Sequence, residues 1–65
     1  MKVGDVVIAT VTVHEPSFDG VPEIYWALPG DELIVRRVIV GGIEVSQRRH
    51  LDAGFRLNDG EFKFK

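Results

Sequence analysis

The chain of 65 residues contains no cysteine. This absence excludes a disulfide framework and any metal site built from thiolates. The two histidines, His14 and His50, lie far apart in the sequence and fit no spacing of metal ligands. We therefore expect no metal and no cofactor. We expect the stability of so small a fold to come from an apolar core, alone or together with self-association.

An excess of positive charge and a long apolar run are also missing. The net charge is −2 and the pI is about 5.5, so no overall positive field attracts a phosphate backbone. No apolar run approaches the roughly 18 residues that a membrane-spanning helix needs. The first residues do not form a signal-peptide pattern. We expect one soluble domain over residues 1–65, located in the cytoplasm and without contact with a membrane.

Helical periodicity is weak throughout, whereas β-branched residues are frequent, which predicts an all-β fold. Residues 6–13 form the strongest strand pattern, with Val7, Ala9, Val11 and Val13 on one face. Further strands are predicted over residues 24–28, 32–40, 43–49, 55–57 and 61–65. Residues 50–54 are predicted to form a loop or one short helical turn that ends at a glycine.

Glycine and proline mark the predicted turns. Pro29–Gly30 has the pattern of a type II turn. Gly41–Gly42 lies between two β-rich runs and predicts a type I′ hairpin in which Val40 pairs with Ile43. Residues 58–60 predict a second hairpin. The first hairpin would assign one apolar group to the core face: Ile34, Val38, Val40, Ile43 and Val45.

Two stretches of the chain resemble a known small fold. A strand that opens with Val3-Gly4-Asp5-Val6-Val7 precedes a long acidic loop. After the loop, Leu28-Pro29-Gly30-Asp31-Glu32-Leu33-Ile34-Val35 is similar to the entry to the second strand of SH3-like barrels. The resemblance implies a five-stranded SH3-like small barrel of the kind found in bacterial and phage proteins.

The sequence departs from the better-known members of that group. It has no Ala-Leu-Tyr-Asp-Tyr start, no tryptophan pair and no Pro-x-x-Tyr near its end. The aromatic groove with which signalling SH3 domains bind polyproline peptides is therefore not implied. The basic surface of ribosomal barrels of related shape is also absent.

Two arginine pairs, Arg36–Arg37 and Arg48–Arg49, are the first candidate site. In the predicted hairpin, Arg37 and Arg48 share one face beside Ser46, and Arg36 and Arg49 share the other. One interpretation is a contact of Arg37 and Arg48 with an anion or a nucleic acid. The other is a solvated strand face on which the arginine stems cover apolar surface.

The long acidic loop is the second candidate, and its residues suit a protein partner. Aromatic rings supply contact area and carboxylates supply orientation. In the alternative interpretation, one ring closes an end of the core and the acids only keep the loop hydrated. Since adjacent strand residues point to opposite faces, one ring of Tyr25 and Trp26 should be exposed. The candidate partner-binding residues are Phe18, Asp19, Glu23, Tyr25 and Trp26.

Catalysis has little support. His50 and Asp52 are the one candidate pair of a base and an orienting carboxylate, and no nucleophile motif accompanies them. At the C-terminal strand, the lysines of residues 62–65 either protect an exposed edge or accompany an edge that pairs with another strand. We predict a non-enzymatic protein–protein interaction module. The alternatives are a nucleic-acid-associated barrel that uses Arg37 and Arg48, and a structural subunit of a homo-oligomer such as a dimer.

Overall fold

The computed structural model describes residues 1–65, and its regular structure consists of strands alone. The predicted all-β class is confirmed. No helix of the chain could cross a membrane. The seven strands are β1 (Val6–Ala9), β2 (Val13–Glu15), β3 (Ile24–Ala27), β4 (Glu32–Ile39), β5 (Gly42–Gln47), β6 (His50–Asn58) and β7 (Phe62–Phe64).

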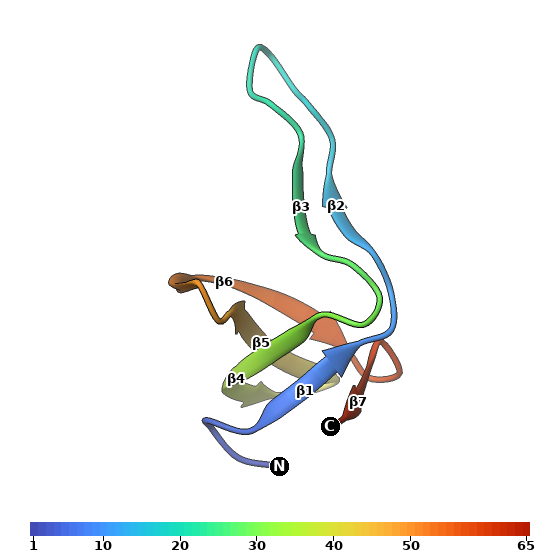
Figure 1. Cartoon of the computed structure of the whole chain (residues 1–65), viewed down its shortest axis with the longest axis vertical. Helices are drawn as coiled ribbons and strands as arrows, with labels where there is room; N and C mark the ends of the chain where they lie inside the picture. Colours follow the sequence, from blue (N-terminus) through green and yellow to red (C-terminus); the bar gives the residue numbers. More distant parts are fainter.

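Five of the strands form one antiparallel sheet in the order β6-β5-β4-β1-β7. The edge strands β6 and β7 do not pair with each other, so the sheet is not a closed barrel. Strands β2 and β3 pair only with each other. Together with the residues between them they form an arm, residues 13–27, that projects away from the sheet (Figure 1).

The arm begins where the predicted first strand breaks. The β-branched run over residues 6–13 is continuous in sequence, yet β1 ends at Ala9 and β2 starts at Val13. The backbone of Ala9 is bonded to Gly30 and Asp31, and the amide of Thr10 donates to the Glu61 carbonyl at 3.0 Å. Beyond Thr10 the neighbouring strands offer no further partner, so the chain leaves the sheet.

The hairpin of β4 and β5 turns one residue earlier than the sequence predicts. Ile39 pairs with Gly42, so Val40 and Gly41 form the turn. Gly41 has a φ of 79°, whereas Val40 has a negative φ. A negative φ followed by a positive one is the type II pattern, which needs one glycine at its second central position. The predicted pairing of Val40 with Ile43 is therefore wrong.

A β-bulge then shifts the pairing of β4 and β5 again. The register changes between Val35 and Arg37, where β4 contains one residue more than β5. Arg37 faces Glu44 on the turn side of the bulge, and beyond the bulge Ser46 faces Ile34. The prediction that Arg37, Arg48 and Ser46 are neighbours is therefore wrong, because both the turn and the bulge change the register.

Two predictions near the C-terminus are also wrong. Residues 50–54 form the start of β6 and not a helical turn. Gln47 pairs with His50 and Ser46 pairs with Gly54, so residues 51–53 are extra on the β6 side. Residues 58–60 do turn the chain, but β7 then pairs with β1 and not with β6, so they do not close a hairpin.

The type II turn at Pro29–Gly30 is confirmed. Gly30 has a φ of 96°, and the amide of Asp31 donates to the Leu28 carbonyl at 3.0 Å. The Asp31 carboxylate in turn accepts from the Leu28 amide at 2.8 Å. This doubly bonded turn directs the chain from the arm into β4.

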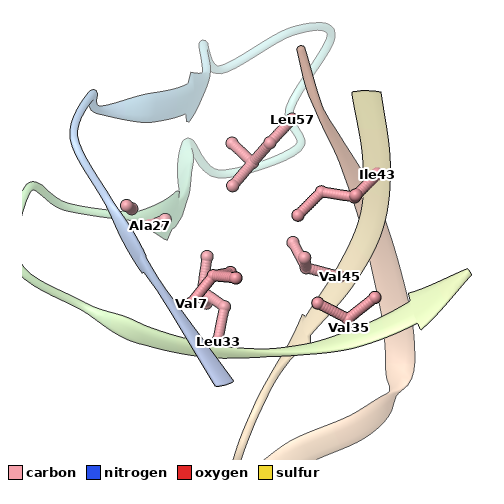
Figure 2. Close-up of a cluster of buried hydrophobic side chains, with 8 residues drawn as sticks. Val7, Ala27, Leu33, Val35, Ile43, Val45 and Leu57 are labelled. Atoms are coloured by element: carbon pink, nitrogen blue, oxygen red, sulfur yellow. The ribbon is translucent and has the colours of Figure 1, made fainter. Parts of the chain in front are cut away.

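A small cluster of apolar side chains forms the core between the sheet and the base of the arm (Figure 2). Val38 and Val40, which the predicted hairpin assigned to the core, are exposed. The accessible surface is 4514 Å², against about 4,200 Å² for a compact protein of this mass. The projecting arm explains this excess. The eight core residues are Val7, Ala9, Ala27, Leu33, Val35, Ile43, Val45 and Leu57.

Candidate functional site

The arm is a β-hairpin whose two sides pair in the same register at its middle and at its tip. His14 pairs with Tyr25, and Phe18 pairs with Val21, so both sides contain the same number of residues and no bulge intervenes. Asp19–Gly20 form the turn, with φ values of 49° and 82°. Two positive φ values are typical of a type I′ turn, whose twist suits a hairpin.

One face of the arm carries a row of exposed aromatic and apolar side chains. Alternate residues of a strand share a face, so the register assigns His14, Phe18, Val21 and Tyr25 to the same side. The rings of His14 and Tyr25 are stacked with their centroids 4.4 Å apart. Phe18 is 79% exposed and Tyr25 is 51% exposed. We call these four side chains the arm stripe; it extends for about 13 Å along the hairpin.

The base of the arm is fixed to the main sheet through Trp26. This side chain is half-buried, and its ring lies 5.8 Å from that of Phe55 in β6. The indole N–H donates to the Glu15 carboxylate at 3.2 Å. The side-chain amide of Gln47 in β5 donates to the Trp26 carbonyl at 2.6 Å. The expectation that one of the two adjacent rings is exposed is confirmed, and the exposed ring is Tyr25.

The arm and its flanks are acidic. Residues 10–31 contain four carboxylates and no lysine or arginine. A carboxylate oxygen of Glu23 lies 3.2 Å from Nε2 of His14, and Glu15 binds Trp26 as described. Asp19 at the tip has no hydrogen-bond partner for its side chain. Of the five sequence-predicted partner-binding residues, four are therefore exposed on the arm, and Trp26 lies at its base.

The structure does not bring Arg37 and Arg48 together. Arg37 binds the Glu44 carboxylate at 3.1 Å, and Arg48 binds that of Glu32 at 3.1 Å. Glu44 lies within β5, whereas Arg48 follows the end of that strand at Gln47. Each of the two guanidinium groups is thus held by a different carboxylate.

The Glu32 carboxylate binds two cationic side chains, an ion-pair cluster that the sequence did not predict. Its carboxylate accepts from Lys65 and from Arg48, both at 3.1 Å. The hydrogen bond and charge of Lys65, with a smaller effect of Arg48, hold the pKa of Glu32 below its usual value. Lys65 is more than thirty residues away in the chain, and no local pattern joins the two. A pocket of about 390 Å³ lies beside this cluster, lined by residues 31–33 and 47–49.

His50 and Asp52 do not form a catalytic pair. Both side chains are exposed on β6, and no hydrogen bond joins them. No group of three or more histidine, aspartate or glutamate side chains is arranged to hold a metal ion.

No family model, curated protein or solved structure matches the chain.

Proposed function

We propose that the protein is a non-enzymatic interaction module that binds another protein through the arm. The observation that carries this proposal is the arm stripe. A large aromatic side chain, Phe18, is 79% exposed at the tip of an ordered hairpin. Contiguous exposed apolar side chains mark interaction sites. Aromatic residues are also enriched in the centres of protein interfaces.

The rigid base of the arm supports the same proposal. A flexible loop loses conformational entropy when it binds, whereas a preformed hairpin has lost most of it on folding. Trp26 is bonded to Glu15 and Gln47 and packs on Phe55. These contacts hold the arm away from the sheet in a form that a partner can engage.

We also propose that the fold is SH3-like. In support, β4 pairs along both of its edges, with β1 on one side and β5 on the other. The last strand returns to pair with β1. A long excursion separates β1 from β4, as the resemblance of residues 28–35 implies. The bacterial or phage origin that the resemblance suggests stays a prediction.

The nucleic-acid alternative has less support. It relies on Arg37 and Arg48, which are separated on the sheet and neutralised by Glu44 and Glu32. Salt-sensitive binding of DNA or RNA that disappears in both Arg37→Ala and Arg48→Ala would favour this alternative over the arm.

The proposal is tested by photocrosslinking from the arm. A photoreactive phenylalanine analogue replaces Phe18, and in a control chain it replaces Val40, which is 95% exposed on the β4–β5 turn. We expect the photoreactive group at position 18 to crosslink one protein, and we expect the group at position 40 not to crosslink it. That protein is then purified, and its affinity is measured for the original chain and for Phe18→Ser.

The crosslinking and affinity measurements have three distinguishable outcomes. Loss of affinity in Phe18→Ser with unchanged melting temperature supports the arm as the binding surface. Capture of the same proteins from both positions, or equal affinity for Phe18→Ser, would overturn the proposal. Capture of the chain by itself from position 18 would favour the homo-oligomer alternative.

A further inference from the structure

The charges of the chain are unevenly distributed. Residues 3–35 contain six carboxylates and no lysine or arginine, whereas residues 36–65 contain seven lysines and arginines and four carboxylates. The arm belongs to the acidic half. Two of its carboxylates, those of Asp19 in the turn and of Glu23 beside His14, lie next to the arm stripe, and both residues are exposed. A partner that covers the stripe meets a negative surface around an apolar centre.

We propose that the partner of the arm is a basic peptide segment that carries apolar side chains and lies along the arm stripe. The inference rests on the proposed function and specifies the chemistry of its partner. Apolar side chains of the segment would pack on Phe18, Val21 and Tyr25. Its lysines or arginines would pair with the surrounding carboxylates, which orient the segment and increase its rate of association.

The segment docks on the face of the arm and does not extend its sheet. Pro16 directly follows β2, and Pro22 lies just before β3. Proline has no N–H, so neither residue can donate to a further strand, which disfavours extension of the sheet between the strands and the tip. The two prolines interrupt the edges between the strands and the tip, while the stripe itself is left uncovered.

A second copy of the chain is a weaker candidate for the occupant. Two arms that met stripe to stripe would bring like charges together. The cations of the sheet are largely engaged within the chain, because five of the eight lysine and arginine side chains bind carboxylates, carbonyls or an amide oxygen. The five are Arg36, Arg37, Arg48, Arg56 and Lys65.

The test uses a displayed library of random peptides about twelve residues long, which exceeds the length of the stripe in extended form. Peptides are selected on the immobilised full chain at low salt, with prior depletion on the bare support. We expect the selected peptides to combine lysine or arginine with leucine, isoleucine or an aromatic residue. A selected peptide should perturb the amide NMR signals of the arm and leave those of β5 unchanged.

Variants then separate the apolar and the charged contributions. Phe18→Ser should weaken binding by at least about tenfold, as expected for a central aromatic contact. Asp19→Asn and Glu23→Gln should each weaken it by roughly two- to fivefold at low salt and less at high salt. Asp52→Asn and Asp59→Asn are the matched controls, because both carboxylates are exposed outside the arm, and they should leave binding unchanged.

Failure of this inference is distinguishable from failure of the proposed function. If no peptide is enriched, or if the enriched peptides have no excess of basic residues, the inference is overturned. Capture of a protein partner from position 18 still tests the proposed function in that case. If the peptides bind equally to Phe18→Ser, or if sedimentation shows that the chain pairs with itself through the stripe, the basic segment is also excluded as the occupant.

Discussion

Replacement of Gly42 by alanine should destabilise the chain far more than replacement of Gly41, although the two residues are adjacent. A Cβ atom on Gly42 would lie 2.2 Å from the carbonyl oxygen of Leu57 and 3.1 Å from the Cα of Asn58. Both neighbours are backbone atoms of β6, so β5 and β6 would have to separate by about 1 Å to restore an ordinary contact. Overpacking typically costs about 1–3 kcal/mol, and we expect the upper end of this range because the collision is with backbone atoms.

Gly41 should be less sensitive, for a different reason. Its φ is 79°, and a Cβ atom would meet only the end of the Arg56 side chain, at 3.3 Å. That side chain can move, so the main cost is the left-handed backbone, about 1 kcal/mol. Gly60 is the matched control, because its φ is 89° and nothing lies within 4 Å of its Cβ position. Gly41→Ala and Gly60→Ala should therefore have similar effects.

Thermal unfolding followed by circular dichroism measures these differences. A chain of this length has a total stability of roughly 3–10 kcal/mol, and each kcal/mol corresponds to about 4–8 °C in Tm. We expect Gly42→Ala to lower the Tm by at least about 12 °C and the other two variants by about 4–8 °C. The turn predicted from sequence requires positive φ at both Gly41 and Gly42 and therefore equal effects. Equal effects would refute the register described here.

Three further predictions concern other parts of the sheet. Ser46→Ala should raise the free energy of unfolding, measured in urea, by about 1 kcal/mol, because the Ser46 hydroxyl is fully buried without a hydrogen-bond partner. A loss of stability would show that the hydroxyl has a hydrogen-bond partner in the folded chain. Glu32→Gln should remove a pH-dependent part of the stability. Since the folded pKa of Glu32 is lowered, its stabilising effect is full above the unfolded value near 4.5 and declines as pH falls through the folded pKa; a constant difference between the two proteins from pH 6 to about pH 2 would contradict this. Deletion of residues 62–65 should lower the Tm, because Phe62 packs against the core and β7 is bonded to β1; an unchanged Tm with altered oligomeric state would indicate that the C-terminal edge serves association.

Local sequence patterns predict the elements of this fold better than their pairing. The β-branched runs indicate strands, and Pro29–Gly30 indicates its turn, because these depend on neighbouring residues alone. The register of β4 and β5 depends on where the chain leaves β4 and on the bulge after Val35. Both are decided by packing in the folded sheet, where Val35 and Val45 face the core. The dipeptide Gly41–Gly42 is compatible both with the predicted type I′ turn and with the observed type II turn at Val40–Gly41.

In the arm, too, the sequence predicts the residues better than their arrangement. Residues 10–12 have the composition of a strand, and their departure from the sheet reflects only the lack of a partner beyond Thr10. The candidate partner-binding residues were predictable, since aromatic and acidic side chains in a Gly- and Pro-rich loop are visible in the sequence. Their arrangement on one face was not, because it depends on the pairing of Phe18 with Val21.

Position along the arm separates the residues that stabilise the chain, at its base, from those available for binding, toward its tip. Val13 and Ala27 pack in or against the core, and Trp26 fixes the base of the arm through Phe55 and Gln47. Phe18 and Tyr25 remain exposed, although a core of only eight side chains would gain from each further ring that it buried. The hairpin pairing prevents that burial, since the rings can reach the core only if the hairpin gives up its register. The apolar surface of the stripe therefore stays uncovered in the isolated chain, and a partner that covers it gains the burial that folding leaves unused.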